Sequence, residues 1–369
     1  MTVLHSSGPN PPAVLTREVH VVVPAGIDDP ASPSGGNRYD RRVCRGLTAD
    51  GWAVHERAVA GGWPHPDADA RAVLHAVLAA LPDGAVVLVD GLVACGVPEV
   101  VVPAARRLAL VVLLHLPLSD EVGAAPELAD RERAVLAAAT AVVATSAWAA
   151  RRAVTLHGLE PERVTVAAPG VDPAPLAPDG DGTNLLCVGA LTPTKGQDLL
   201  VAALAGLADL TWTATFVGPL RDDAHVAAVR GAVTRHDLDA RVRLTGALTG
   251  AALDAAYAAA DLLVVPSRAE TYGMVVTEAL ARGVPVLVSD AGGLPETLGR
   301  DPGGRVPGMV VQAGRVAPLG AALHGWLIDP ARRAELRRYA QWRRELLQGW
   351  EVTSRCVATV LTRAGGTPA

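Results

Sequence analysis

The chain alternates twice between short apolar runs and segments with helical spacing. Runs such as 108–114 (LALVVLL) and 261–267 (DLLVVPS) are separated by amphipathic stretches. Apolar strands placed between helices are typical of a parallel sheet that is covered on both faces. The alternation stops at a linker rich in Pro, Gly and Asp, 174–184, and then restarts. We therefore predict an α/β fold made of two tandem Rossmann-like, doubly wound domains that face each other across a cleft.

The length of the chain agrees with two domains, because 369 residues exceed the usual size of a single hydrophobic core. We predict an N-terminal domain over residues 1–173 and a C-terminal domain over 174–345. Residues 346–369 are expected to form a helix that packs back on the N-terminal domain. Ligands of such sheets bind outside the carboxyl ends of the strands, so the cleft is the expected site.

Composition excludes several classes of protein. The net charge of −5 argues against strong nonspecific binding of nucleic acid. The four cysteines are far apart and show no metal-binding spacing, which favours reduced thiols in the cytoplasm. Residues 1–17 are expected to be a loose leader that lacks the pattern of a signal peptide. The longest apolar run, 108–114, is too short to span a bilayer.

One lysine, Lys195, is present among 33 basic residues, and it lies between a predicted strand (185–190) and a predicted helix (196–207). A cation at a helix N-terminus opposes the helix dipole, so its position makes better sense if an anion binds there. The surrounding GALTPTKG superficially resembles a P-loop. Thr194 replaces the second glycine and Gly196 replaces the Ser/Thr of that motif, which argues against an NTPase.

A second candidate anion site is the strand–loop–helix segment 264–280, which carries Glu270, Gly273 and Glu278. A loop carboxylate such as Glu270 can accept hydrogen bonds from two sugar hydroxyls, and Glu278 from a ribose diol. Gly273 lets backbone N–H groups approach a phosphate. Each residue alone has a simpler interpretation: a solvated loop, a turn glycine, and a pair between Glu278 and Arg282 worth about 0.3–0.5 kcal/mol. Together they favour a site for a sugar diphosphate.

The N-terminal half offers weaker candidates. Gly35 and Gly36 lie in the segment that joins the first strand to the first helix, where they would either let the backbone approach a ligand or form a flexible turn. His115 ends an apolar strand and would either point into the cleft or be a core histidine. Asp67-Ala68-Asp69 is interpreted as a helix cap, and no catalytic metal is predicted. The arginines within 332–344 are expected to form a solvated face, with membrane contact at most peripheral.

These residues resemble those of the family-4 retaining glycosyltransferases, which have the glycosyltransferase-B fold. The segment PSRAETYGMVVTEALARGVPVLVSDAGGLPE is similar to the E-x₇-E region of that family, with Glu270 and Glu278 as its two glutamates. VGALTPTKG resembles the phosphate-binding strand and loop, and GVD at 170–172 resembles the interdomain exit. The similarity covers nearly the whole chain.

The resemblance implies a role for each candidate residue. Lys195, Glu270 and His115 would act at the reacting centre: Lys195 on the leaving phosphate, Glu270 on the donor sugar, and His115, with Gly36, from the N-terminal side. The donor site would comprise Gly35, Gly36, Gly189, Lys195, Thr245, Glu270, Gly273, Met274, Val275 and Glu278. Within it, residues 273–275 would present their backbone to the diphosphate, Glu278 would hold the ribose, and Thr245 would flank the base.

One position departs from the family. The glycine that matches Gly189 is usually followed by an arginine that joins the lysine on the diphosphate, and here that residue is Ala190. Arg221 or Arg268 is expected to substitute, or else Lys195 and helix dipoles suffice.

The predicted activity is transfer of a hexosyl unit from a nucleotide diphosphate sugar, UDP- or GDP-linked, to a small-molecule, sugar or lipid acceptor, with retention of configuration and without a cofactor or metal. Three alternatives remain open. A sugar-nucleotide epimerase would need no acceptor, and a non-catalytic sugar-nucleotide-binding protein would not turn over. A pyridine-nucleotide dehydrogenase is the weakest, because neither half opens with the required glycine pattern.

Overall fold

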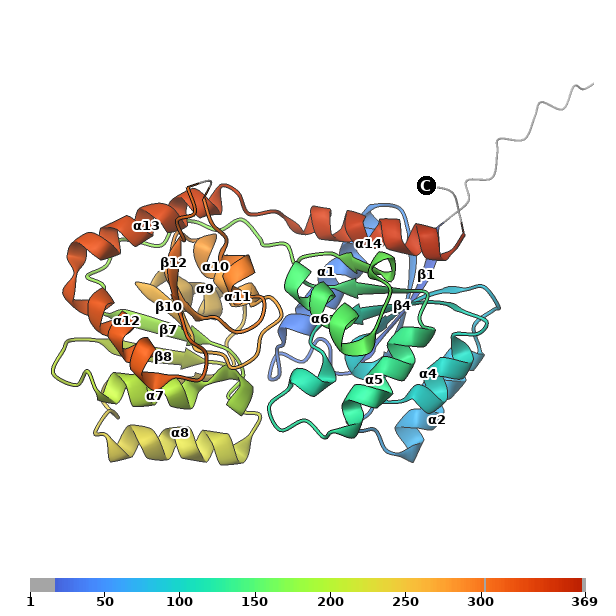
Figure 1. Ribbon diagram of the computed structural model, residues 1–369, viewed down its shortest axis with the longest axis horizontal. Coiled ribbons are helices and arrows are strands. Elements are labelled where there is room, and N and C mark those ends of the chain that lie inside the picture. The colour runs from blue at the N-terminus through green and yellow to red at the C-terminus, as the bar shows by residue number, and fades with distance from the viewer. Residues whose placement is uncertain (1–16, 302, 367–369) are drawn as a thin grey trace, which may run out of the picture.

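A computed structural model of the chain describes residues 17–301 and 303–366. It contains two α/β domains side by side, each built on one parallel sheet, as the sequence predicts (Figure 1). The expected leader, residues 1–17, lies outside the described residues except for Arg17. Within the described part of the chain, no helix combines the length and apolar character needed to cross a membrane.

The N-terminal sheet has the strand order β2-β1-β3-β4-β5-β6 among the described residues. All its pairs are parallel. Its strands are β1 (Glu18–Pro24), β2 (Ala53–Val59), β3 (Val86–Asp90), β4 (Ala109–Leu114), β5 (Ala141–Ala144) and β6 (Val164–Val166). The helices of this half are α1 (Gly35–Ala49), α2 (Ala68–Ala79), α3 (Gly91–Ala94), α4 (Pro98–Ala104), α5 (Glu127–Ala138) and α6 (Ala147–His157).

The C-terminal sheet has the order β12-β11-β10-β7-β8-β9, again with parallel pairs. Its strands are β7 (Asn184–Val188), β8 (Thr213–Val217), β9 (Val242–Gly246), β10 (Leu262–Val265), β11 (Val286–Ser289) and β12 (Gly308–Val311). Its helices are α7 (Gln197–Ala205), α8 (Asp223–Arg235), α9 (Gly250–Ala258), α10 (Met274–Leu280), α11 (Leu294–Leu298), α12 (Val316–Ile328) and α13 (Pro330–Arg344). If β7 is numbered as the first strand of this half and the sheet is read from β9 to β12, the strand order is 3-2-1-4-5-6, as in dinucleotide-binding folds.

Helix starts follow the capping chemistry of the sequence. Asp67 accepts a hydrogen bond from the Ala70 N–H and caps α2, as predicted. Ser34 does the same for α1 by accepting from the Asn37 N–H. This cap brings Gly35 and Gly36 into the first turn of α1, so the flexible turn that we considered for them is wrong.

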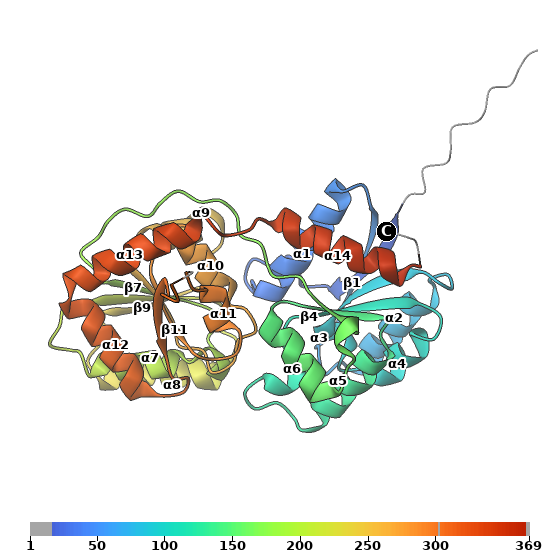
Figure 2. The same cartoon turned by 45° about the horizontal axis from the view of Figure 1, so that its top comes forward.

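The last helix, α14 (Trp350–Ala364), lies across the N-terminal domain beside α1, whereas α13 lies on the C-terminal domain (Figures 1 and 2). Trp350, Val357 and Leu361 share a buried core cluster with Tyr39 and other residues of the N-terminal domain. At Gly46 the two helices approach so closely that an added Cβ would overlap the side chain of Ser354. The chain therefore crosses between the domains twice, after β6 and after α13.

The arginines of α13 correct one expectation. We predicted a solvated face, but four of these side chains are half-buried and donate hydrogen bonds to backbone carbonyls. Arg333 donates to Trp326 and Leu327, and Arg344 donates to Ala281 and Ala174. Arg337 and Arg343 make similar bonds. A guanidinium carries five donors, so it can satisfy the free carbonyls at the ends of neighbouring elements. Arg332 and Arg338 are exposed.

Candidate active site between the domains

A cleft of about 940 Å³ lies between the two sheets, lined by residues of both domains. In the C-terminal domain it opens at the neighbouring strands β7 and β10, whose following loops carry Lys195 and Glu270. In the N-terminal domain the loop after β1 meets the same cleft, beside the reversal point between β1 and β3, and His115 follows β4. These are the points where each strand order reverses, which is where open α/β sheets bind ligands.

Lys195 and Glu270 are a direct ion pair in this cleft. Lys195 ends the 3₁₀ turn Pro193–Lys195, and its Nζ lies 2.6 Å from Oε2 of Glu270. Burial by itself would lower the pKa of Lys195, but the charge and hydrogen bond of Glu270 outweigh it and raise the pKa above its usual value. The ammonium is therefore charged throughout the physiological range, and its charge is balanced by the carboxylate.

Two glycines hold the loop that carries Glu270. The Gly293 N–H donates to the Glu270 carbonyl at 2.9 Å, and Gly292 has a positive φ of 56°. An added Cβ at Gly292 would overlap the Glu270 carbonyl oxygen, and one at Gly293 would overlap that of Thr271. The AGG sequence at 291–293 thus acts as a close-fitting support for the Glu270 loop.

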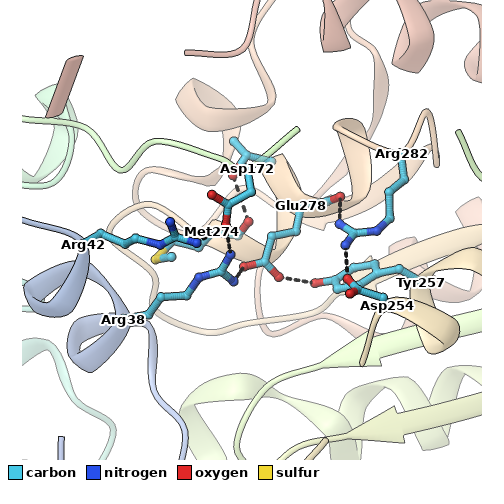
Figure 3. Close-up of polar contacts among 9 residues, drawn as sticks. Arg38, Arg42, Asp172, Asp254, Tyr257, Met274, Glu278 and Arg282 are labelled. Atoms are coloured by element: carbon cyan, nitrogen blue, oxygen red, sulfur yellow. Dashed lines mark hydrogen bonds and ion pairs between the residues drawn. The ribbon is translucent and has the colours of Figure 1, made fainter. Parts of the chain in front are cut away.

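Glu278, on α10, is nearly buried, and both of its carboxylate oxygens have partners (Figure 3). The Tyr257 hydroxyl donates to Oε2 at 2.7 Å, and Arg38 of the N-terminal domain donates to Oε1. The alternative that we considered, a side-chain pair with Arg282, does not form. Arg282 instead donates to the backbone carbonyl of Glu278 at 2.9 Å and pairs with Asp254.

His115 enters the cleft from the N-terminal side and is held on several sides. Its Nε2 lies 2.8 Å from Oδ1 of Asp40, a buried residue of α1. An added Cβ at Gly36 would lie 3.2 Å from the imidazole, and the Tyr39 ring meets it edge-on at 5.2 Å. Burial lowers the pKa of His115, but Asp40 and the nearby carboxyl of Asp90 outweigh burial and raise it to about 9. We infer that the ring is an imidazolium at neutral pH.

The raised pKa of His115 predicts a pH dependence of stability. The folded protein keeps this proton up to about pH 9, whereas an ordinary histidine loses it near 6.5. The pair with Asp40 therefore contributes fully below pH 6.5, and its contribution should be lost as the pH rises through 9. We expect Asp40→Asn to lower the pKa of His115 and to reduce this loss. Titration of the His115 imidazole by NMR measures the shift, and an unchanged pKa in the variant would contradict the assignment.

Asp40, Asp90 and His115 are also the described residues whose arrangement could hold a metal ion, because one ligand atom from each lies within 4.8 Å of the others. The Asp40 and Asp90 carboxyls are buried, and burial, followed by the charge of Asp40, raises the pKa of Asp90 to about 7. The imidazole nitrogen nearest to Asp40 is already engaged with it. A site without metal stays our prediction.

The structure brings most of the predicted donor residues to one cleft. Its lining includes Gly35, Gly36, His115, Gly189, Lys195, Glu270, Gly273, Met274, Val275 and Glu278. Thr245 is placed differently: its hydroxyl donates to the carbonyls of Phe216 and Gly246, and it is absent from the lining. The following loop, at Leu248 and Thr249, lines the cleft instead.

The two arginines that we expected to replace the family arginine are both occupied. Arg268 donates to both carboxylate oxygens of Asp198 and to the Pro193 carbonyl. Arg221 lines the cleft, but it donates to Ser32 of the opposite domain.

Several residues at the site were not predicted from the sequence, chiefly Arg38, Asp40 and Tyr257. The signal for Asp40 was present, because this acidic residue lies on the buried face of α1 with Tyr39, Val43 and Leu47. A carboxylate on an apolar helix face needs a partner. No signal in the sequence points from Arg38 to Glu278, which lies 240 residues further along the chain.

Polar contacts around the cleft hold the domains together. Oγ of Ser146 donates to the Thr271 carbonyl at 2.6 Å, and Thr194 donates to Glu121 at 2.7 Å. Glu296 of α11 accepts from the Ala147 and Trp148 N–H groups at 2.7 and 2.9 Å, so it caps α6 from the opposite domain. These hydrogen bonds link the two domains directly beside the cleft.

Comparison with known proteins agrees with the fold and the motifs. Residues 171–343 match the family model of the glycosyl transferases group 1. A curated D-inositol 3-phosphate glycosyltransferase of Kineococcus radiotolerans is 34% identical over 271 residues, which cover 66% of this chain and 62% of the relative. The alignment thus spans less than two thirds of that relative's length.

Solved structures show the same two-domain fold. Sucrose-phosphate synthase from Thermosynechococcus elongatus superposes with a TM-score of 0.77 at 22% identity, over 94% of this chain and 98% of that one. HepE from Anabaena, in complex with UDP and glucose, gives 0.75 at 19% identity, over 94% and 100%. Residues 171–343 therefore match the glycosyl transferases group 1, and the chain as a whole has the glycosyltransferase-B fold and is similar to family-4 glycosyltransferases.

Proposed function

We propose that the protein is a retaining glycosyltransferase that moves a hexosyl unit from a nucleotide diphosphate sugar to an acceptor hydroxyl. The observation that carries this proposal is the meeting of Lys195, Glu270 and Glu278 with His115 in one cleft. A nucleotide sugar has a sugar, a pyrophosphate and a ribose in series. Glu270 and Glu278 offer carboxylates for the hydroxyls at its two ends, and Lys195 offers a cation for the phosphates between them.

The proposed role of Lys195 follows from the charge that develops on the leaving group. Departure of the nucleoside diphosphate builds negative charge on its terminal phosphate, and a preorganised cation such as Lys195 stabilises that charge. Among the described residues that line the cleft, we assign no covalent nucleophile, so we propose a same-face displacement through an ion-pair-like state. Closure of the two domains around the bound donor would limit attack by water on it.

The donor is proposed to be UDP- or GDP-linked, with UDP first, because HepE is described in complex with UDP-glucose. No further cofactor or metal is proposed. The acceptor is proposed to be a phosphorylated polyol or sugar, since the curated relatives are named D-inositol 3-phosphate glycosyltransferases. Arginines of α1 that line the N-terminal wall, among them Arg41 and the exposed Arg45, would suit an anionic group. A cytoplasmic location stays a prediction from the sequence.

The test is a matrix of UDP, GDP and ADP sugars with and without phosphorylated and unphosphorylated polyols. We expect nucleoside diphosphate release that depends on the acceptor, and NMR of the product should show the donor's anomeric configuration. Conversion of the donor alone into an isomer would instead support the epimerase. Saturable binding without turnover on any acceptor would support the non-catalytic binding protein.

A ligand-binding measurement comes before that assay. A ligand present at 100 times its Kd adds about 2.7 kcal/mol to the free energy of unfolding. We therefore expect one family of nucleoside diphosphates to raise the Tm by several degrees, because a change of that size is a large fraction of the stability of a typical domain. A Tm that no nucleoside diphosphate changes at millimolar concentration would count against both the transferase and the binding protein.

A further inference from the structure

Both glutamates that the proposed function assigns to the donor already hold a cation. Glu270 pairs with Lys195 at 2.6 Å, and Glu278 pairs with Arg38. The side chain of Glu278 is only 9% exposed and that of Glu270 15%, so neither carboxylate has free access to water. A poorly hydrated carboxylate needs such partners. A ligand that uses these oxygens must therefore replace Lys195 and Arg38 with donors of its own.

A nucleotide sugar is suited to that replacement. Its sugar and ribose hydroxyls can donate to the two carboxylates, and the Tyr257 hydroxyl can remain on Glu278. The pyrophosphate connects the two ends of the ligand, so it must lie between Glu270 and Glu278. The two cations that the hydroxyls displace would then flank the negatively charged part of the same molecule.

We propose that Arg38 is a donor-binding residue that changes partner: it binds Glu278 in the absence of ligand and the pyrophosphate when the donor is bound. This inference rests on the proposed function, and it adds a second phosphate-binding cation that comes from the N-terminal domain. Arg38 would bind the pyrophosphate from the ribose end of the donor, as Lys195 would from the sugar end. Because Arg38 belongs to α1 and Glu278 to α10, the exchange makes donor binding depend on both domains (Figure 3).

The neighbours of Arg38 would keep it at the cleft after the exchange. Its Nη2 donates to Oδ2 of Asp172 at 3.1 Å, through a different nitrogen from the one that meets Glu278. Asp172 is itself held by Arg42. One nitrogen of Arg38 thus stays anchored while the other becomes free for a phosphate oxygen. Asp172 thus stays paired with both Arg38 and Arg42 during the exchange, and Glu278 keeps the Tyr257 hydroxyl as a donor.

Three arginines of the C-terminal domain in or near the cleft are less suited to this role. Arg268 uses its guanidinium on Asp198, and Arg282 is held by Asp254 and the Glu278 carbonyl. Arg221 donates to Ser32. Of these arginines, Arg38 is the one whose partner is a carboxylate that the donor itself would engage.

The test compares a nucleoside diphosphate with its nucleoside in wild type and Arg38→Gln. Calorimetric Kd values are measured for UDP and uridine, and for the GDP and ADP pairs. We expect Arg38→Gln to weaken binding of the preferred diphosphate about tenfold or more, the size of a lost charge-assisted contact. Binding of the matching nucleoside should be unchanged or tighter, because the competitor for Glu278 is gone. Arg38→Lys should give an intermediate diphosphate affinity.

Arg131→Gln is the matched control, because Arg131 also belongs to the N-terminal domain and pairs with a glutamate, Glu99, outside the lining of the cleft. It should leave both affinities at the wild-type value. If Arg38→Gln tightens both ligands, the residue only competes for Glu278 and the proposal is wrong. Equal weakening of both ligands, or no change, means a purely structural pair and also overturns it. A wild type that binds no nucleoside diphosphate overturns the proposed function together with this inference.

Discussion

Replacement of Lys195 by alanine is expected to reduce the rate of glycosyl transfer by about 100-fold or more while the domains stay folded. This residue is the one lysine of the chain, and it supplies a cation at the point where the leaving group would gain charge. Loss of one preorganised group of this kind typically costs on the order of 10²–10³ in rate. The measurement is the initial rate of acceptor-dependent release of nucleoside diphosphate at saturating donor.

Two controls separate this effect from a general loss of structure. Arg332→Ala removes an exposed cation of α13 that is not part of the lining of the cleft, and it should keep the wild-type rate. Glu270→Gln removes the partner of Lys195 and should weaken the donor's sugar contacts, with the lysine retained. A Lys195→Ala protein with normal circular dichroism and a near-normal rate would exclude the lysine from the reaction.

The second large effect is expected from Gly292→Ala. Gly292 has a φ of 56°, and an added Cβ would overlap the Glu270 carbonyl. A left-handed backbone costs an alanine on the order of 1 kcal/mol, and the overlap must additionally displace the Glu270 loop. We expect the variant to lose both donor binding and activity, and to unfold at a lower denaturant concentration than the wild type.

Gly314→Ala is the control that separates the cost of a left-handed backbone from the cost of a steric overlap. Gly314 also has a positive φ, 71°, but an added Cβ there would meet no atom within 4 Å. The free energy of unfolding of this control should fall only by what a left-handed backbone costs an alanine, and its donor affinity should stay at the wild-type value. If the two variants lose equal stability and both bind donor normally, Gly292 does not support the Glu270 loop.

The fold could be predicted because its signals are local. Strand runs such as 108–114 are apolar throughout, and β4 occupies Ala109–Leu114. Caps also depend on residues that are close in sequence, as at Asp67 and α2. The short helix α3 was not predicted, because its start depends on the Asp90 side chain accepting from the Leu92 N–H, directly after a strand. The run of helical residues there is too short to show a period.

The site could be predicted only in part, because its partners are distant in sequence. Glu278 was recognised from its spacing to Glu270, but its pairing was weighed only against Arg282, four residues away. In the structure its side-chain partners are Arg38 and Tyr257. Similarly, the arginines of α13 were predicted to be solvated, whereas four of them donate to carbonyls of other elements. Such acceptors leave no signal in the amino-acid pattern.

We propose that one nucleotide sugar binds Lys195, Glu270 and Glu278 at the same time in the interdomain cleft. A crystal structure with the preferred nucleoside diphosphate bound tests it most directly. In that crystal we expect the ribose diol on the Glu278 carboxylate, the diphosphate against the Lys195 ammonium, and Arg38 moved from Glu278 to the phosphates. A diphosphate bound elsewhere, or one bound in the cleft with both original ion pairs intact, would contradict it.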